Sequence, residues 1–171
     1  MKRPKDSIDG LCQSIVRKHE TNDPFKLAKA LDVHVEFDNI GSVKGYYCCM
    51  NRIRMIAISK DLDENLSRLV CAHELGHDRL HRNLAIFSPL RDTEFSSTAR
   101  HEIEANRFAA SLLVREDEFM ELASYGYTDE QIAAALNIHV EMVRIKSDLL
   151  RRAGIQLRIQ EMPRFDFIRN I

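Results

Sequence analysis

The sequence predicts an α+β fold that is mostly helical, with a small sheet of about three strands. Apolar residues recur at helical spacing over most of the chain, whereas patterns typical of strands occur at residues 33–58 and, more weakly, in the C-terminal tail. The 171 residues are 44% hydrophobic and 30% charged, which is ordinary for a globular protein with one buried core. Together these observations predict one domain's worth of helices around a minor sheet.

Two short helices are expected at the start of the chain. Apolar residues between positions 8 and 16 recur at helical spacing and indicate the first. The second is expected to begin at Asp23 and Pro24, because aspartate caps helix N-termini and proline fits the first helical position.

Three strands are expected next. Val33, Val35 and Phe37 alternate with polar residues, which indicates a strand. Two further strand segments, 45–50 and 53–58, are separated by Asn51-Arg52, which would form a hairpin turn. We therefore expect a small antiparallel or mixed sheet.

The remainder of the chain is predicted to be largely helical, with a loop of about fifteen residues at 83–97 that would be functional or mobile. We divide the chain into a main domain, a helix-turn-helix-like extension packed on it, and a tail that is either a strand or irregular. The domain limits are 1–125, 126–153 and 154–171. The expected helices cover 61–81, 98–114, 116–124, 128–136 and 139–152.

Charge and composition exclude several classes of protein. Lys and Arg total 25 against 26 Asp and Glu, a net charge of −1 that argues against a broadly basic nucleic-acid surface. No apolar run approaches the ~20 residues of a transmembrane helix, and the N-terminus lacks the apolar segment of a signal peptide. We therefore expect a cytoplasmic protein with no membrane partner. Its cysteines are expected to be reduced and mostly buried, at positions 12, 48, 49 and 71.

The most informative segment is V-C-A-H-E-L-G-H-D-R-L-H, residues 70–81. His73 and His77 are four residues apart on a predicted helix, so they share one face about 6 Å apart along the axis. Two imidazoles placed in this way can occupy two corners of a zinc tetrahedron. Glu74 can then polarise a water instead of binding the metal.

A catalytic zinc needs a third protein ligand, and the predicted helix at 98–114 offers two candidates. Glu102 lies within about 40° of Asn106 on that helix, on the face with small residues that would approach the His pair. Glu104 points about 200° away, towards Arg100 or Arg107. We favour Glu102 as the ligand, with Asn106 hydrogen-bonding a ligand histidine.

These motifs resemble those of the ImmA/IrrE family of zinc metallopeptidases. The resemblance covers roughly residues 8–125, and Val114-Arg115 departs from it, since family members usually have Met-Pro there. The chain resembles the stand-alone, ImmA-like form of the family, without a fused repressor-type DNA-binding domain. The matching segments, in the family's order, are T-N-D-P-F-K-L-A-K-A-L (21–31), G-Y-Y (45–47), H-E-L-G-H-D-R-L-H (73–81) and E-I-E-A-N-R-F-A-A-S-L-L (102–113).

The resemblance implies a zincin-like core that hydrolyses peptide bonds with Zn²⁺ as cofactor. It also implies a protein substrate, a helix-turn-helix repressor of a phage or other mobile element, cleaved to switch on silenced genes. An antitoxin is the alternative substrate, and an activating protein is a further expected partner.

The proposed roles follow from this picture. Glu74 would be the general base, and Tyr46 or His81 would contact the substrate or the oxyanion, although a structural role is favoured for His81. The strand at 53–58 would align an extended substrate by edge pairing. Gly76 would leave room either for that strand or for a packed helix. Asp78 is expected to be a solvated surface charge.

Two alternatives come from other classes of protein. Residues 127–150 resemble a helix-turn-helix, which would make the chain a DNA-binding regulator with Arg144 and Lys146 on its second helix. The neutral total charge disfavours nucleic acid as a partner. The other alternative is a metal-binding pseudo-enzyme or sensor.

Overall fold

The computed structural model describes residues 7–82 and 96–157, with side chains in the second stretch from residue 100 onward. The predicted α+β class is confirmed. The expected tail beyond Leu157 and most of the expected 83–97 loop lie outside the described residues. The described helices are α1 (Ile8–His19), α2 (Pro24–Ala30), α3 (Glu64–Leu80), α4 (Ser96–Leu113), α5 (Glu116–Ser124), α6 (Asp129–Leu136) and α7 (Val140–Arg152). The strands are β1 (His34–Asp38), β2 (Gly45–Met50) and β3 (Ile53–Ser59).

Side-chain caps set where several helices begin. The Asp23 carboxylate accepts hydrogen bonds from the backbone N–H groups of Phe25 and Lys26, both at 2.9 Å, so α2 begins where the sequence predicted. Thr128 and Gln131 form a reciprocal capping box at the start of α6. α4 begins at Ser96, two residues before the predicted start at 98, so the expected loop at 83–97 is too long at its C-terminal end.

The sheet is mixed, with strand order β1-β3-β2. β1 runs parallel to β3, whereas β2 pairs with it in antiparallel register, Tyr47 opposite Ile56. Asn51 and Arg52 both have positive φ, which is the backbone of a tight two-residue hairpin. The expectation that the 53–58 strand presents a free edge is wrong, because β3 is the central strand and both its edges are paired.

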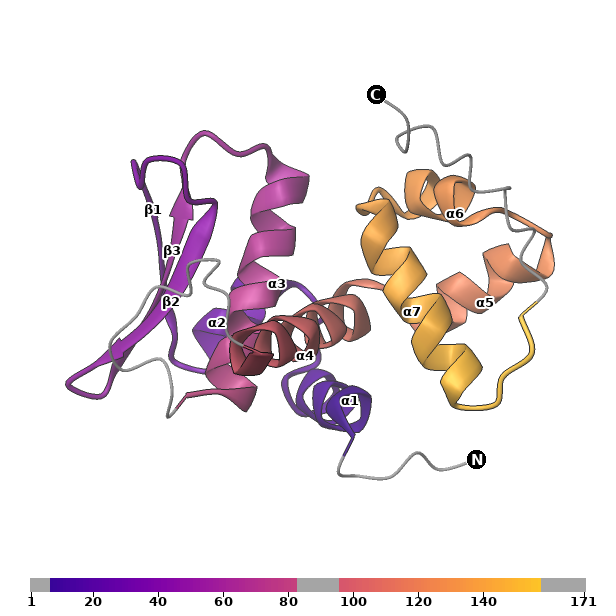
Figure 1. Cartoon of the computed structure of the whole chain (residues 1–171), viewed down its shortest axis with the longest axis horizontal. Helices are drawn as coiled ribbons and strands as arrows, with labels where there is room; N and C mark the ends of the chain where they lie inside the picture. Colours follow the sequence, from indigo (N-terminus) through magenta and orange to yellow (C-terminus); the bar gives the residue numbers. More distant parts are fainter. Residues whose placement is uncertain (1–6, 83–95, 158–171) are drawn as a thin grey trace.

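Figure 1 shows the sheet and helices α5, α6 and α7 at opposite ends of the molecule, with α3 and α4 between them. α3 packs against β2 and β3, while α4 packs against α1, α3 and α7. One continuous cluster of buried apolar residues joins these layers, and it includes Leu75 of α3, Phe108 of α4 and Leu150 of α7. α6 and α7 therefore share the core of the main part, while the proposed limits at 125 and 153 stay a prediction.

β2 passes very close to α3 at Gly45. A Cβ atom there would lie 2.3 Å from Cγ1 of Val70 and 3.0 Å from the backbone oxygen of Ala57. Only glycine fits without displacing the helix or the neighbouring strand. This contact fixes the strand against the helix that carries the histidines.

The helix-turn-helix-like segment does not offer its cations to a ligand in the way expected. Lys146 is 1% exposed and lies 3.3 Å from Asp9 of α1, and Arg144 donates to Glu130 at 2.8 Å. Phosphate binding would require breaking both ion pairs, one of them buried. Among the described helices, none is long and apolar enough to cross a membrane.

Candidate metal centre

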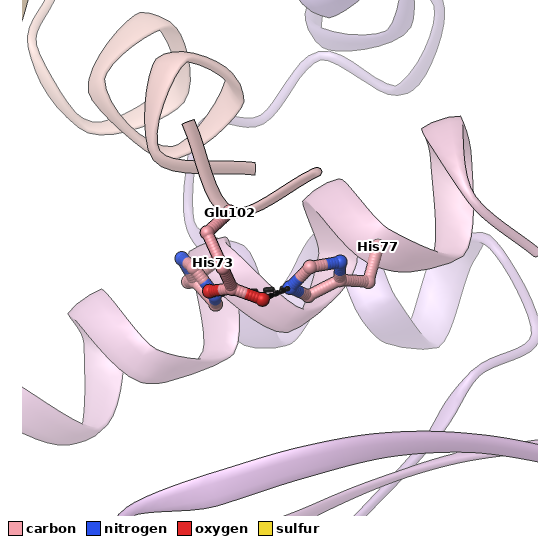
Figure 2. A group of neighbouring side chains, drawn as sticks. All are labelled: His73, His77 and Glu102. Carbon is pink, nitrogen blue, oxygen red and sulfur yellow. Dashed lines mark hydrogen bonds and ion pairs between the residues drawn. The ribbon is translucent and has the colours of Figure 1, made fainter. Parts of the chain in front are cut away.

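Two helices bring three potential metal ligands together. His73 and His77 lie on successive turns of α3, and Glu102 faces them from α4 (Figure 2). The Nε2 atoms of the two histidines are 3.0 Å apart. Nε2 of His73 is 3.1 Å from Glu102 Oε2, and Nε2 of His77 is 3.3 Å from Glu102 Oε1.

This donor set suits a metal ion. A tetrahedral ion with bonds of 2.0–2.1 Å places its ligand atoms about 3.3 Å apart, close to the 3.0 Å between the two Nε2 atoms, and each Nε2 has a different Glu102 oxygen at a similar distance. All three ligand atoms lie within 4.8 Å of one another. Two nitrogens and a carboxylate leave one tetrahedral position open, which is the pattern of a catalytic centre.

Asn106 lies one helical turn after Glu102 on α4, and its side chain contacts His73. Its Oδ1 is 2.8 Å from Nδ1 of His73, which acts as the donor when that nitrogen carries the proton. This tautomer leaves the Nε2 lone pair of His73 directed at the cluster. Within the described residues, Nδ1 of His77 has no corresponding partner.

The two histidine rings shift the pKa of the Glu102 carboxylate, and Glu102 in turn shifts the pKa of His73. Burial alone would raise the pKa of Glu102, but hydrogen bonds and charge from His73 and His77 hold it at about 2. Burial lowers the pKa of His73, and the hydrogen bond to Glu102 and the nearby charge of Glu74 outweigh it, so this pKa lies above its ordinary 6.5.

Glu74 is 7% exposed and does not belong to the ligand cluster. Burial raises the pKa of its carboxyl group, an effect opposed by the positive charge of His73 and His77 and by the Tyr47 backbone. A buried carboxylate with a raised pKa beside a metal site is a stronger proton acceptor than an exposed one. Its position allows it to act on a water without binding the metal.

The alternative ligand Glu104 is directed elsewhere. Its Oε1 accepts from Arg100 at 2.9 Å, and its Oε2 lies 3.5 Å from Nε2 of His81. The His81 ring also packs against His101, with ring centroids 4.4 Å apart. His81 is 8% exposed, so in this conformation it lies within a packed group beside the site. Tyr46 is half-buried on β2.

The expectation that Asp78 is a solvated charge is wrong. It is 1% exposed, and its carboxylate accepts a hydrogen bond from Tyr47 Oη at 2.9 Å and contacts the Arg54 guanidinium at 3.4 Å. Arg54 also donates to the backbone oxygen of Leu31. Burial raises the pKa of Tyr47, and the charge of Asp78 raises it further. This buried group connects β2 and β3 to the helix that carries the histidines.

A signal for Asp78 was present in the sequence. On a helix, position 78 lies within about 20° of position 71 and about 60° of position 75, which are occupied by Cys71 and Leu75. Both are fully buried, so Asp78 continues their stripe. A carboxylate in a buried stripe needs a partner, and Arg54 and Tyr47 supply it. The cysteine expectation holds for Cys71 and Cys12, whereas Cys48 and Cys49 are only half-buried.

Gly76 allows α3 and α4 to approach each other. A Cβ atom at this position would lie 2.9 Å from Cα of Ala105 and 3.1 Å from its backbone oxygen. Of the two roles considered for this glycine, helix packing is therefore the one that the contacts support. The approach brings Glu102 within reach of the two histidines.

We expect Gly76→Ala to destabilise the protein, although alanine is the better helix former by about 1 kcal/mol. The added methyl group meets backbone atoms of Ala105, and overpacking of this kind costs about 1–3 kcal/mol. Urea unfolding of the metal-free proteins measures the difference. A variant more stable than the parent would show that the two helices are not held this closely.

Comparison with known proteins gives one family and two relatives. The family described as Peptidase_M78, the IrrE N-terminal-like domain, matches residues 28–148. "Uncharacterized immunity region protein 2" of Bacillus phage phi105 is 28% identical over 144 residues, covering 84% of this chain and 90% of that protein. "Metallopeptidase ImmA" of Bacillus subtilis (strain 168) is 28% identical over 130 residues, covering 74% and 75% respectively.

Proposed function

Because the chain belongs to the IrrE N-terminal-like family of M78 metallopeptidases, as its motifs indicated, we propose that it is a zinc-dependent endopeptidase. His73, His77 and Glu102 would hold the Zn²⁺, and Glu74 would be the general base. The observation that carries this proposal is the three-ligand cluster between α3 and α4, with a fourth position open and Glu74 buried beside it.

The residues of this chain divide the chemistry among them. Zinc, when bound, supplies Lewis acidity to the scissile carbonyl and lowers the pKa of water. Glu74 takes the proton of the attacking water and delivers it to the leaving amine. Asn106 holds the His73 ring in the orientation that binding needs. Tyr46 is the proposed contact to the substrate or to the oxyanion, because His81 is packed against Glu104 and His101.

An extended substrate would align along β2, not β3. β2 is an outer strand whose second edge has no strand partner among the described residues. It also carries Tyr46, and the backbone of Tyr47 reaches Glu74. A peptide added to this edge would therefore run beside the general base.

We propose that the substrate is a helix-turn-helix repressor of a phage or other mobile element. The name of the phage relative places that protein in an immunity region, and the Bacillus subtilis relative is named a metallopeptidase. Cleavage would relieve repression, and an activating protein would control when it occurs. An antitoxin with a similar DNA-binding domain is the second candidate substrate.

The substrate proposal can be tested by co-expressing this chain with a candidate helix-turn-helix repressor, with and without the signal that induces the mobile element. Mass spectrometry of the repressor would identify new termini. We expect one major cut with the parent and none with Glu74→Gln. A repressor that stays intact under inducing conditions, in the presence of zinc-loaded peptidase, would contradict this substrate.

Metal binding should weaken as the pH falls. Zinc binds the neutral imidazole, so protons compete with it below the pKa of each ligand histidine in the metal-free protein. Burial lowers the pKa of His73, but the hydrogen bond to Glu102 and the charge of Glu74 outweigh it and raise this pKa, so the competition begins at a higher pH than for an ordinary histidine. Each competing proton should lower the apparent zinc affinity about ten-fold per pH unit. Chelator competition between pH 8 and pH 5 measures this affinity. A zinc affinity that does not change over that range would contradict histidine ligation.

A further inference from the structure

A groove between α4 and α7 lies next to the proposed metal centre. We call it the α4/α7 groove, and its volume is about 240 Å³. This is smaller than the 300–1,000 Å³ of typical small-molecule sites, so it suits one or two side chains better than a whole ligand. Its lining residues are Ile103, Asn106, Arg107, Glu141, Ile145, Asp148, Leu149 and Arg152.

The groove and the metal cluster share part of α4. Asn106 lines the groove and also hydrogen-bonds His73. Ile103 directly follows Glu102, about 100° further around the helix. A peptide whose scissile bond lies at the cluster can therefore place a neighbouring side chain in the groove without leaving the surface of α4.

The lining defines which side chain fits. Ile103, Ile145 and Leu149 provide apolar surface, and Ile103 is 51% exposed although it is a large aliphatic residue. An exposed aliphatic side chain beside a catalytic cluster gains free energy when a second apolar group covers it.

The acidic and basic side chains that line the groove differ in whether they have ion-pair partners. Asp148 lies 3.8 Å from Arg151, and Glu141 lies 3.8 Å from Arg144. Arg144 pairs more closely with Glu130, at 2.8 Å, so the two acidic groups are only partly neutralised. Arg107 and Arg152 make no ion pair with any residue that the structure describes. The groove thus offers two guanidinium groups to an incoming carboxylate.

We propose that the α4/α7 groove is a substrate subsite that binds a large apolar side chain next to the scissile bond, with Arg107 and Arg152 receiving an acidic neighbour. This subsite rests on the proposed peptidase function, and it adds a sequence preference. The occupant is a segment of the protein substrate.

The test uses zinc-loaded Glu74→Gln protein immobilised on beads and a bacterial proteome digested with trypsin as the probe. Peptides retained after washing are identified by mass spectrometry. We expect peptides in which a large apolar residue adjoins Asp or Glu to be enriched about ten-fold or more over the input, the size of effect that filling an apolar pocket produces.

Three further variants in the Glu74→Gln background make the result specific. Leu149→Arg fills the groove and should abolish the enrichment, whereas Ala135→Arg adds the same charge to an exposed position of α6 outside the groove and should preserve it. Arg107→Glu should keep the apolar preference and lose the acidic one. Equal zinc content in all the proteins verifies that the variants are folded.

The outcomes separate the subsite from the function. Unchanged enrichment in Leu149→Arg, or no enrichment of such peptides with the Glu74→Gln parent, would overturn the subsite. The retained peptides are then given to zinc-loaded protein with Glu74 intact. Peptides that depend on the groove for retention but stay uncut, together with a repressor that stays intact under inducing conditions, would contradict the peptidase function and leave the groove as a peptide-binding site.

Discussion

Glu74→Gln should retain zinc and lower kcat for peptide hydrolysis by a factor of about 10²–10⁴, the usual contribution of a general acid–base group. Glutamine has nearly the shape of glutamate and fills the same buried position, but it cannot accept the proton of the attacking water. Glu74 lies outside the cluster of His73, His77 and Glu102, so the metal ligands stay in place.

Two measurements on the same preparation test this prediction: zinc per chain, and the rate of cleavage of the repressor or of a peptide identified by the groove experiment. Glu104→Gln is the matched control, because Glu104 lies on α4 two residues from Glu102 but pairs with Arg100 and is not part of the ligand cluster. A Glu74→Gln protein that binds one zinc and cleaves as fast as the parent would eliminate Glu74 as the base.

Asp78→Ala should cause the largest loss of stability, roughly 3–5 kcal/mol, because it removes the acceptor of the buried Tyr47 phenol and the carboxylate beside Arg54. The Arg54 guanidinium keeps its hydrogen bond to Leu31. Arg54 and Tyr47 both lie in the sheet, whereas Asp78 lies on α3, so the change also loosens the contact between sheet and helix. For each kcal/mol of unfolding free energy lost, the Tm of a domain of this size falls by about 2–4 °C. We therefore expect the Tm to drop by roughly 6–20 °C.

Thermal and urea unfolding of the metal-free proteins measure this loss. Asp61→Ala is the control, since Asp61 is exposed just before α3 and its carboxylate makes no ion pair with a described residue. If Asp78→Ala unfolded within about 0.5 kcal/mol of the Asp61 control, the Arg54–Asp78–Tyr47 group would not hold the sheet on the helix.

Local signals were enough to predict the helices. The N-cap at Asp23 and the capping box at Thr128 mark helix starts through hydrogen bonds made within a few residues. The choice of Glu102 over Glu104 as the residue facing the histidines also followed from helical phase, because two positions apart on a helix means nearly opposite faces.

The order of the strands could not be predicted in this way. Pairing of β1 with β3 joins segments about twenty residues apart, and no local pattern distinguishes a central strand from an outer one. The substrate edge was therefore assigned to the wrong strand. β3 did carry a signal, because its second half is a run of mostly apolar residues without polar alternation. Residues Ile56–Ser59 are all buried, as expected for a central strand covered on both faces.

Buried polar contacts were also beyond a local reading. Lys146 was considered as a phosphate contact, but it lies buried against Asp9, 137 residues away in sequence. The helical phase of Asp78 with Cys71 and Leu75 indicates burial, but its partners Tyr47 and Arg54 lie in strands that the sequence does not bring close.

The central claim is that His73, His77 and Glu102 hold one zinc ion, and metal analysis by plasma mass spectrometry tests it most directly. The account predicts about one zinc per chain in the parent and in Glu104→Ala, and a sharp reduction in Glu102→Ala. Zinc retained in full by Glu102→Ala but lost from Glu104→Ala would contradict the ligand set. Absence of zinc from the parent, even after reconstitution, would contradict the peptidase account as a whole.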